Sequence, residues 1–273
     1  MKLHSKTAIS YMFRNFWKLV YVTLPASALL ALFYNPAKEL QLFGMLVAGQ
    51  LTMDDYTYWV GNSLTVLRFG NTWWATLISL VVFAFAMSIM IVKLDRHMRM
   101  GVMPALPLRR AFGIFPIMLA YILCWLVTVE VFALVAVGIS YMAKFLGSVT
   151  AIVSLTIALS FVFKAIIAYM FVLLLISFPL KYSENYRFNR ALSYSARIMF
   201  PKKRLLLGIA LAYPFARAIV MALGYLLAPY HLDLLVYGVG VLFATTFVPC
   251  FAFKHYYDDV GGERRDLPRS IFG

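Results

Sequence analysis

The sequence predicts an all-α integral membrane protein that has six transmembrane helices, an N-terminal amphipathic interfacial helix and a long central helical hairpin. Of its 273 residues, 63% are hydrophobic and only 13% are charged, and the mean hydropathy is +0.83. Apolar runs of about 20 residues recur along the chain, and each is long enough to cross the hydrocarbon core of a bilayer. Because these runs occupy most of residues 1–273, we expect one transmembrane domain and no separate soluble domain.

Residues 6–18 carry the pattern of an amphipathic helix that lies at the membrane surface. Polar residues recur there at a four-residue spacing, which places them on one face of a helix, while Phe13, Trp17 and other apolar residues fill the opposite face. The first span is expected at residues 19–34, where an Asn-Pro pair closes it. The polar residues of the amphipathic segment are Lys6, Ser10, Arg14 and Lys18.

Five further spans complete the predicted bundle. Two of them form the central hairpin, and each is about 32 residues long, or roughly 48 Å as a straight helix. That length exceeds the hydrocarbon core, so these helices must tilt, kink or extend beyond the bilayer. No structure is predicted for the connection at residues 35–71, and residues 254–273 are expected to form a partly disordered cytoplasmic tail. The five spans are expected at residues 72–92, 111–142, 149–180, 205–227 and 234–253.

The basic residues predict the orientation of the bundle. If both termini are cytoplasmic, 20 of the 25 lysines and arginines lie on the cytoplasmic side, many of them in basic loops at residues 93–110 and 181–204. Lysine and arginine are enriched in the cytoplasmic loops of membrane proteins. The sequence therefore predicts a multi-pass membrane protein with both termini in the cytoplasm, and the family resemblance described below implies a bacterial cytoplasmic membrane. The same bias accounts for the net charge of +14 without a nucleic-acid partner.

Three ionisable residues, Glu130, Lys164 and Arg217, lie inside predicted spans. If the hairpin turns about residue 147, Glu130 and Lys164 each lie 17 residues from the turn and therefore at nearly the same depth. An acid and a base at one depth predict a structural pair. The alternatives are a functional polar site, and a lysine that extends to the interface without contacting the acid. Arg217 follows Pro214, which frees a backbone carbonyl group in the helix. This carbonyl group, a lipid phosphate and Glu130 are three alternative partners for the Arg217 side chain.

A second amphipathic helix is predicted within residues 186–200, in the most basic stretch of the chain. Its arginines fall on one face, its small and apolar residues fall mostly on the other, and Pro201 ends it. Such a face is typical of cytoplasmic anchoring, and it also fits anionic lipid head groups or a cytosolic protein. The residues predicted to form this basic surface, together with the N-terminal helix, are Lys6, Arg14, Lys18, Arg187, Arg190, Arg197, Lys202, Lys203 and Arg204.

Motifs of catalysis and of cofactor binding are missing from the sequence. It has no glycine-rich phosphate loop, no G-x-S-x-G motif and no H-E-x-x-H motif, and its four histidines are scattered. Cys124 and Cys250 lie in predicted spans without a metal-binding spacing, and the adjacent Asp54 and Asp55 have no third carboxylate nearby. We therefore predict a protein that is not an enzyme, that has no catalytic residues, and that binds no cofactor or metal.

Residues 177–218 resemble a known family. A span ends in Ser177-Phe178-Pro179, a short polar turn follows, and Arg190-Ala191-Leu192-Ser193-Tyr194-Ser195 leads a short basic helix into the next span. This pattern resembles the YciC-like bacterial inner-membrane proteins, a family of uncharacterised role, and looks similar to the membrane domain appended to some glycerophosphodiester phosphodiesterases. The resemblance implies a six-helix integral membrane protein and supplies no catalytic residues. Three more segments agree in their order along the chain: Tyr11–Trp17, Leu108–Phe112 and Phe253–Tyr257.

The functional prediction follows from this architecture. We expect a non-enzymatic membrane protein that organises lipid or a partner, or that contributes to maintenance of the cell envelope. One alternative is a small transporter or channel whose polar path includes Glu130, Lys164 and Arg217. The other is a permease-like subunit that docks a cytosolic ATPase through residues 186–200. Membrane lipids are the expected partners, and in the last case a cytosolic protein binds the basic helix.

Overall fold

The structure, a computed structural model, contains helices and loops but no strand in the residues that it describes. The predicted all-α fold is confirmed there. The connection at residues 35–71, apart from positions 45 and 48, lies outside these residues, as do Asp54 and Asp55 and the tail beyond residue 263. The described residues are 4–33, 73–143, 149–184, 186–199 and 203–263, with the single positions 45, 48 and 145.

Five helices in this part of the chain are long and apolar enough to cross a membrane. The first predicted span corresponds to α2 (Phe16–Phe33), which is apolar but shorter than these five. A sixth crossing by α2 therefore stays a prediction, whereas the helical membrane architecture is confirmed. The five long helices are α5 (Trp73–Met100), α6 (Leu108–Ala143), α7 (Val149–Glu184), α9 (Lys203–Leu227) and α10 (Asp233–Glu263).

Two of the long helices continue beyond their predicted ends. α5 runs through the first eight residues of the predicted basic loop and ends near Gly101, whose φ of 73° is a left-handed conformation that glycine adopts without strain. α10 continues to Glu263, so residues 254–263 of the tail that was expected to be partly disordered are helical. Leu94 and Tyr256, both in the added turns, are buried. Packing against neighbouring helices therefore extends α5 and α10 past the end of their apolar runs.

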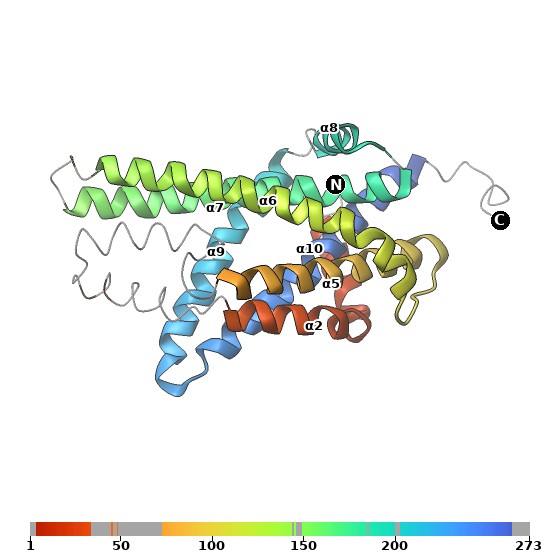
Figure 1. Cartoon of the computed structure of the whole chain (residues 1–273), viewed down its shortest axis with the longest axis horizontal. Helices are drawn as coiled ribbons and strands as arrows, with labels where there is room; N and C mark the ends of the chain where they lie inside the picture. Colours follow the sequence, from red (N-terminus) through yellow and green to blue (C-terminus); the bar gives the residue numbers. More distant parts are fainter. Residues whose placement is uncertain are drawn as a thin grey trace.

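The helix ends divide the molecule into two poles. Figure 1 shows α8 (Phe188–Met199), the loop between α5 and α6, and the C-terminal end of α10 toward one pole, which we call the basic end. The hairpin tip and the short helix η3 (Ala228–Tyr230), which joins α9 to α10, lie at the opposite pole. α1 (His4–Arg14) packs against α10, and Asn15 separates it from α2. The basic end holds Arg14, Lys18, Lys93, Arg96, Arg109, Arg110, Lys181, Arg187, Arg190, Arg197 and Lys254.

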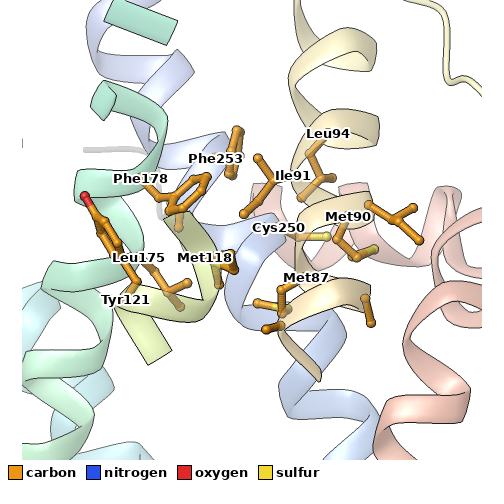
Figure 2. Close-up of a cluster of buried hydrophobic side chains, with 14 of the residues drawn as sticks. Met87, Met90, Ile91, Leu94, Met118, Tyr121, Leu175, Phe178, Cys250 and Phe253 are labelled. Carbon is orange, nitrogen blue, oxygen red and sulfur yellow. The ribbon is translucent and has the colours of Figure 1, made fainter. Parts of the chain in front are cut away.

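The hydrophobic core lies toward the basic end, where α5 packs against α2, α6 and α10. Every residue of α5 from Ala86 to Asp95 is buried. Methionine is well represented in this cluster, and its flexible side chain fills irregular gaps between helices. The side chains labelled in Figure 2 are Met87, Met90, Ile91 and Leu94 of α5, Met118 and Tyr121 of α6, Leu175 and Phe178 of α7, and Cys250 and Phe253 of α10.

Two hydroxyl pairs connect α2 to α10. Thr23 Oγ1 lies 2.9 Å from Thr246 Oγ1, and Ser27 Oγ lies 2.8 Å from Thr245 Oγ1. Hydroxyl groups that hydrogen-bond across helices are a common source of association in an apolar medium, where a hydroxyl has few other partners. α2 is thereby held against α10 although 218 residues or more separate the bonded groups along the chain.

Candidate functional site

Ring contacts fix the register of the α6–α7 hairpin, and with it the depth of Glu130 and Lys164. The ring centroids of Phe132 and Phe163 are 6.1 Å apart. Those of Trp125 and Phe171 are 5.2 Å apart, in the same antiparallel register. Glu130 lies two residues from Phe132, and Lys164 follows Phe163, so both charged residues lie at nearly the same level of the hairpin, as predicted. Both side chains are half-buried and interact with neighbouring groups; their mutual pairing stays a prediction.

Arg217 lies on α9, which packs on α7. The ring centroids of Phe161 and Phe215 are 4.9 Å apart and mark the contact between these two helices. Figure 1 shows α9 crossing α7 at a steep angle, and Arg217 and Lys164 lie two and three residues from the two rings, so both charged residues lie near this crossing. Pro214, one turn before Arg217, is buried. The three charged residues thus lie on α6, α7 and α9, and α7, which carries Lys164, packs against both other helices.

The inward face of α8 attaches this helix to the basic end of the bundle. Ala191 and Ser195 are completely buried, and the Ser195 hydroxyl donates to the Leu192 carbonyl at 2.8 Å. The Phe188 ring meets Tyr121 of α6 with a centroid distance of 4.8 Å. Figure 1 shows α8 nearly end-on where α6 and α7 are seen from the side, so α8 crosses the hairpin. A helix held in this way lies along the membrane surface when the hairpin spans the membrane.

The outward face of α8 carries the predicted arginines. Arg187, Arg190 and Arg197 are all exposed, and the Arg197 guanidinium carbon lies 5.9 Å from the centroid of the Tyr194 ring. Tyr194 in turn stacks on Tyr186, with centroids 5.2 Å apart. The predicted division of this helix into a basic face and a small or apolar face is confirmed. Its cations are held at the surface by a helix whose other side is fixed in the core.

The junction between α1 and α2 adds a second cationic area. Arg14 and Lys18 are exposed, and Trp17 between them is 81% exposed. The predicted apolar face of the N-terminal helix divides in two: Met12 is buried, whereas Phe13 points outward. Exposed aromatic rings beside cations are typical of a membrane–water interface. Of the other residues predicted for the basic surface, Lys202 lies outside the described residues, and the side chains of Lys6, Lys203 and Arg204 do as well.

A buried lysine that the sequence analysis had assigned to a loop is the best-defined polar group of the basic end. Lys93 of α5 is 1% exposed. Its Nζ donates to the carbonyl oxygens of Pro104 at 2.9 Å and Ala105 at 2.8 Å, and also to the Tyr21 hydroxyl. The Tyr21 hydroxyl donates to the Ala105 carbonyl. Lys93 therefore ties α2 and the loop between α5 and α6 to the end of α5.

Two more side chains of the same helix end each meet a tyrosine from another element. The Tyr257 hydroxyl of α10 donates to the carboxylate of Asp95, which is buried. The Tyr11 hydroxyl of α1 lies 2.6 Å from His97 Nδ1. Burial raises the pKa of Tyr11, so its hydroxyl stays protonated at neutral pH. The one sequence signal for this arrangement was Leu94 and Met98, which continue the helical spacing of apolar residues beyond the predicted span.

No cluster of metal-binding side chains is evident where the structure describes the chain. Among those residues, no group of three or more histidine, cysteine, aspartate and glutamate side chains could hold a metal ion. Cys124 and Cys250 are both free thiols, the first exposed and the second buried. No protein-family model matches the chain, and no curated protein or solved structure matches it. The resemblance to YciC-like proteins accordingly stays a prediction.

Proposed function

We propose that this integral membrane protein binds anionic lipid head groups at its basic end, in a bacterial cytoplasmic membrane, and that it is not an enzyme. That the protein is a helical membrane protein rests on its five long apolar helices. The observation that carries the proposal is the orientation of α8. This helix buries Ala191 and Ser195 and presents Arg190 and Arg197 outward, and Arg187, directly before the helix, is exposed as well.

The chemistry of these groups fits a lipid phosphate. A guanidinium group offers several N–H donors in a planar arrangement that matches phosphate oxygens. A basic side chain near an anionic membrane surface contributes about 1 kcal/mol of attraction. Because α8 is fixed to the bundle by its buried face, little conformational freedom is lost when the arginines bind a head group.

The orientation proposed for the protein places this surface where anionic lipid is available. The C-terminal end of α10, α8 and the loop between α5 and α6 lie toward the basic end (Figure 1). By the positive-inside rule, that end belongs on the cytoplasmic side. We therefore propose that the inner leaflet supplies the lipid and that Arg14 and Lys18, next to the exposed Trp17, lie in the same leaflet.

The test is the lipid content of protein purified from membranes that contain phosphatidylglycerol and phosphatidylethanolamine. In a variant with Arg187→Gln, Arg190→Gln and Arg197→Gln, we expect a several-fold loss of co-purified phosphatidylglycerol. The matching triple Arg→Lys variant keeps the charge and retains most of it, and Asn189→Ser, an exposed neutral position on α8, changes nothing. Equal phosphatidylglycerol in the wild type and the Gln variant would contradict the proposal. A soluble protein that co-purifies and is lost on replacing Arg190 or Arg197 would instead favour an ATPase-docking subunit.

The shared depth of Glu130 and Lys164 supports a second candidate function. A transporter or channel would use these residues, with Arg217, as a polar path across the bilayer. Under this alternative, neutralising any of the three abolishes flux of a charged solute into vesicles while the protein stays folded. Variants that lose stability together with flux would argue for a structural role of the three charges.

A further inference from the structure

The loop between α5 and α6 combines an apolar surface with carbonyl groups that are hydrogen-bonded within the protein. Residues 101–107 contain no charged side chain. Val102 is 67% exposed and Leu106 is 55% exposed, and the exposed Leu108 follows at the start of α6. An exposed apolar loop is unusual at a water-facing surface unless another phase or molecule covers it.

Four carbonyl groups of this loop, those of residues 104–107, are hydrogen-bonded within the protein. The carbonyl oxygens of Pro104 and Ala105 accept from Lys93, and that of Ala105 also accepts from the Tyr21 hydroxyl. The Leu106 carbonyl accepts from the Leu108 N–H at 3.0 Å, and the Pro107 carbonyl accepts from the Ala111 N–H at 3.0 Å. Four consecutive carbonyl groups therefore have partners without solvent. Pro104 and Pro107 also have no N–H group that would need an acceptor.

Satisfied backbone groups are the condition for placing irregular chain in a non-aqueous environment. An unpaired carbonyl in an apolar medium costs several kcal/mol, which normally excludes loops from lipid. Here a buried ammonium group and a tyrosine hydroxyl supply the donors that water would otherwise provide.

The neighbours of the loop indicate which phase covers it. Tyr21, bonded to the loop, belongs to an exposed stripe of α2 that includes Trp17 and Leu24. Residues at this spacing share one face of a helix, and in a spanning or interfacial helix that face contacts lipid. Arg109 and Arg110, directly after the loop, are exposed. An apolar surface flanked by aromatic rings and cations matches the boundary between head groups and acyl chains of an anionic leaflet.

We propose that residues 101–107 insert into the lipid leaflet at the basic end, at the level of the head-group and acyl-chain boundary. Lys93 and Tyr21 keep the loop there by binding its carbonyl groups. Val102 and Leu106 contact acyl chains, and Arg109 and Arg110 meet lipid phosphates. This inference does not depend on lipid binding by α8, because it requires only that the protein resides in a membrane.

The experiment measures the surroundings of spin labels in the full chain, reconstituted in vesicles of phosphatidylethanolamine and phosphatidylglycerol. Cys250 is buried, so only Cys124 needs replacement by alanine before labelling. Labels are placed by Val102→Cys and Leu106→Cys. Ser193→Cys on the outward face of α8 is the reference for a position at the membrane surface, and Val127→Cys on an exposed part of α6 is the lipid reference. Collision rates with oxygen report lipid, and those with a water-soluble nickel chelate report water.

We expect the ratio of oxygen to nickel collisions at positions 102 and 106 to be several-fold higher than at 193 and to approach that at 127. A ratio equal to that at 193 would overturn the proposal. In the second arm, Tyr21→Phe removes one donor to the Ala105 carbonyl, and the ratio at position 102 is expected to fall. An unchanged ratio would overturn the role assigned to the donors. Tyr21→Phe keeps the ring and its packing, so this variant tests the hydroxyl group without disturbing the contacts of α2.

Discussion

Lys93 and the arginines of α8 lie at the same end of the molecule, but their surroundings are opposite. Lys93 is buried at the end of α5 and has three oxygen partners from α2 and the following loop. Arg187, Arg190 and Arg197 are exposed on a helix that is fixed by its other face. In the sequence, both sets of cations fall in basic segments that follow an apolar run.

The comparison separates two uses of positive charge in a membrane protein. A buried cation with defined oxygen partners stabilises the fold, because its removal leaves those oxygens without donors. An exposed cation contributes little to folding and is available to a ligand. We therefore expect replacement of a buried polar group to lower the free energy of unfolding, and replacement of an exposed cation to lower ligand affinity.

The largest effect is expected for Lys93→Met. This change leaves the Pro104 and Ala105 carbonyl groups without their ammonium donor, and we expect a loss of about 3 kcal/mol in the free energy of unfolding. The measurement is thermal and denaturant unfolding in detergent. The control is Arg110→Met, which removes an exposed cation at the start of α6 and should change stability by less than about 0.5 kcal/mol. Equal losses of stability in the two variants would contradict the distinction between a buried structural cation and an exposed one.

The hairpin charges come next, because they are half-buried. If Glu130 and Lys164 pair, Glu130→Gln and Lys164→Leu should each cost about 2 kcal/mol, and the double variant should recover most of that loss. The measurement is a double-mutant cycle on unfolding, together with the abundance of each variant in the membrane. Normal folding of all three variants would show that the charges are kept for something other than stability, and flux assays would follow.

A smaller effect is expected at the contact between α2 and α10. Thr23→Val removes the hydrogen bond to Thr246 and should lower stability by about 0.6 kcal/mol, the average for such bonds between membrane helices. Thr128→Val is the matched control, since the Thr128 hydroxyl bonds only to a carbonyl of its own helix, at Cys124. A loss at Thr128 as large as that at Thr23 would contradict the importance of the interhelical bond.

The α8 variant should show the smallest effect on folding. Replacing Arg187, Arg190 and Arg197 by glutamine should change the unfolding free energy by less than about 0.5 kcal/mol, because all three side chains are exposed. Its effect should appear in lipid affinity instead. At about 1 kcal/mol for each basic residue, the loss for anionic lipid is roughly a hundredfold.

Much of the fold could be predicted because it depends on local composition. Long apolar runs predicted the helices, and the positions of Glu130 and Lys164 relative to the hairpin turn predicted their common depth. The two faces of α8 followed from the spacing of its arginines and small residues. Each of these properties depends on neighbours within one or two helical turns, or on counting along a hairpin.

The polar contacts of the basic end could not be predicted in the same way. Lys93 reads as an ordinary flanking cation, since its partner Tyr21 lies 72 residues earlier in the chain. Tyr257, which bonds to Asp95, lies 162 residues after it, in a segment expected to form a partly disordered tail. Only the packing of α1, α2 and α10 around α5 brings these groups together. For the same reason, the extension of α5 and α10 beyond their apolar runs has no local signal strong enough to predict it.

The different roles of Lys93 and the α8 arginines can be tested by measuring stability and lipid binding on the same samples. Native mass spectrometry counts phosphatidylglycerol bound to the folded wild type, to Lys93→Met and to the triple Arg→Gln variant of α8, and each sample is also unfolded. We predict that Lys93→Met lowers stability and leaves binding at α8 intact, whereas the triple variant loses bound phosphatidylglycerol and keeps its stability. If the triple variant binds as much phosphatidylglycerol as the wild type, the proposed function of the basic end is wrong.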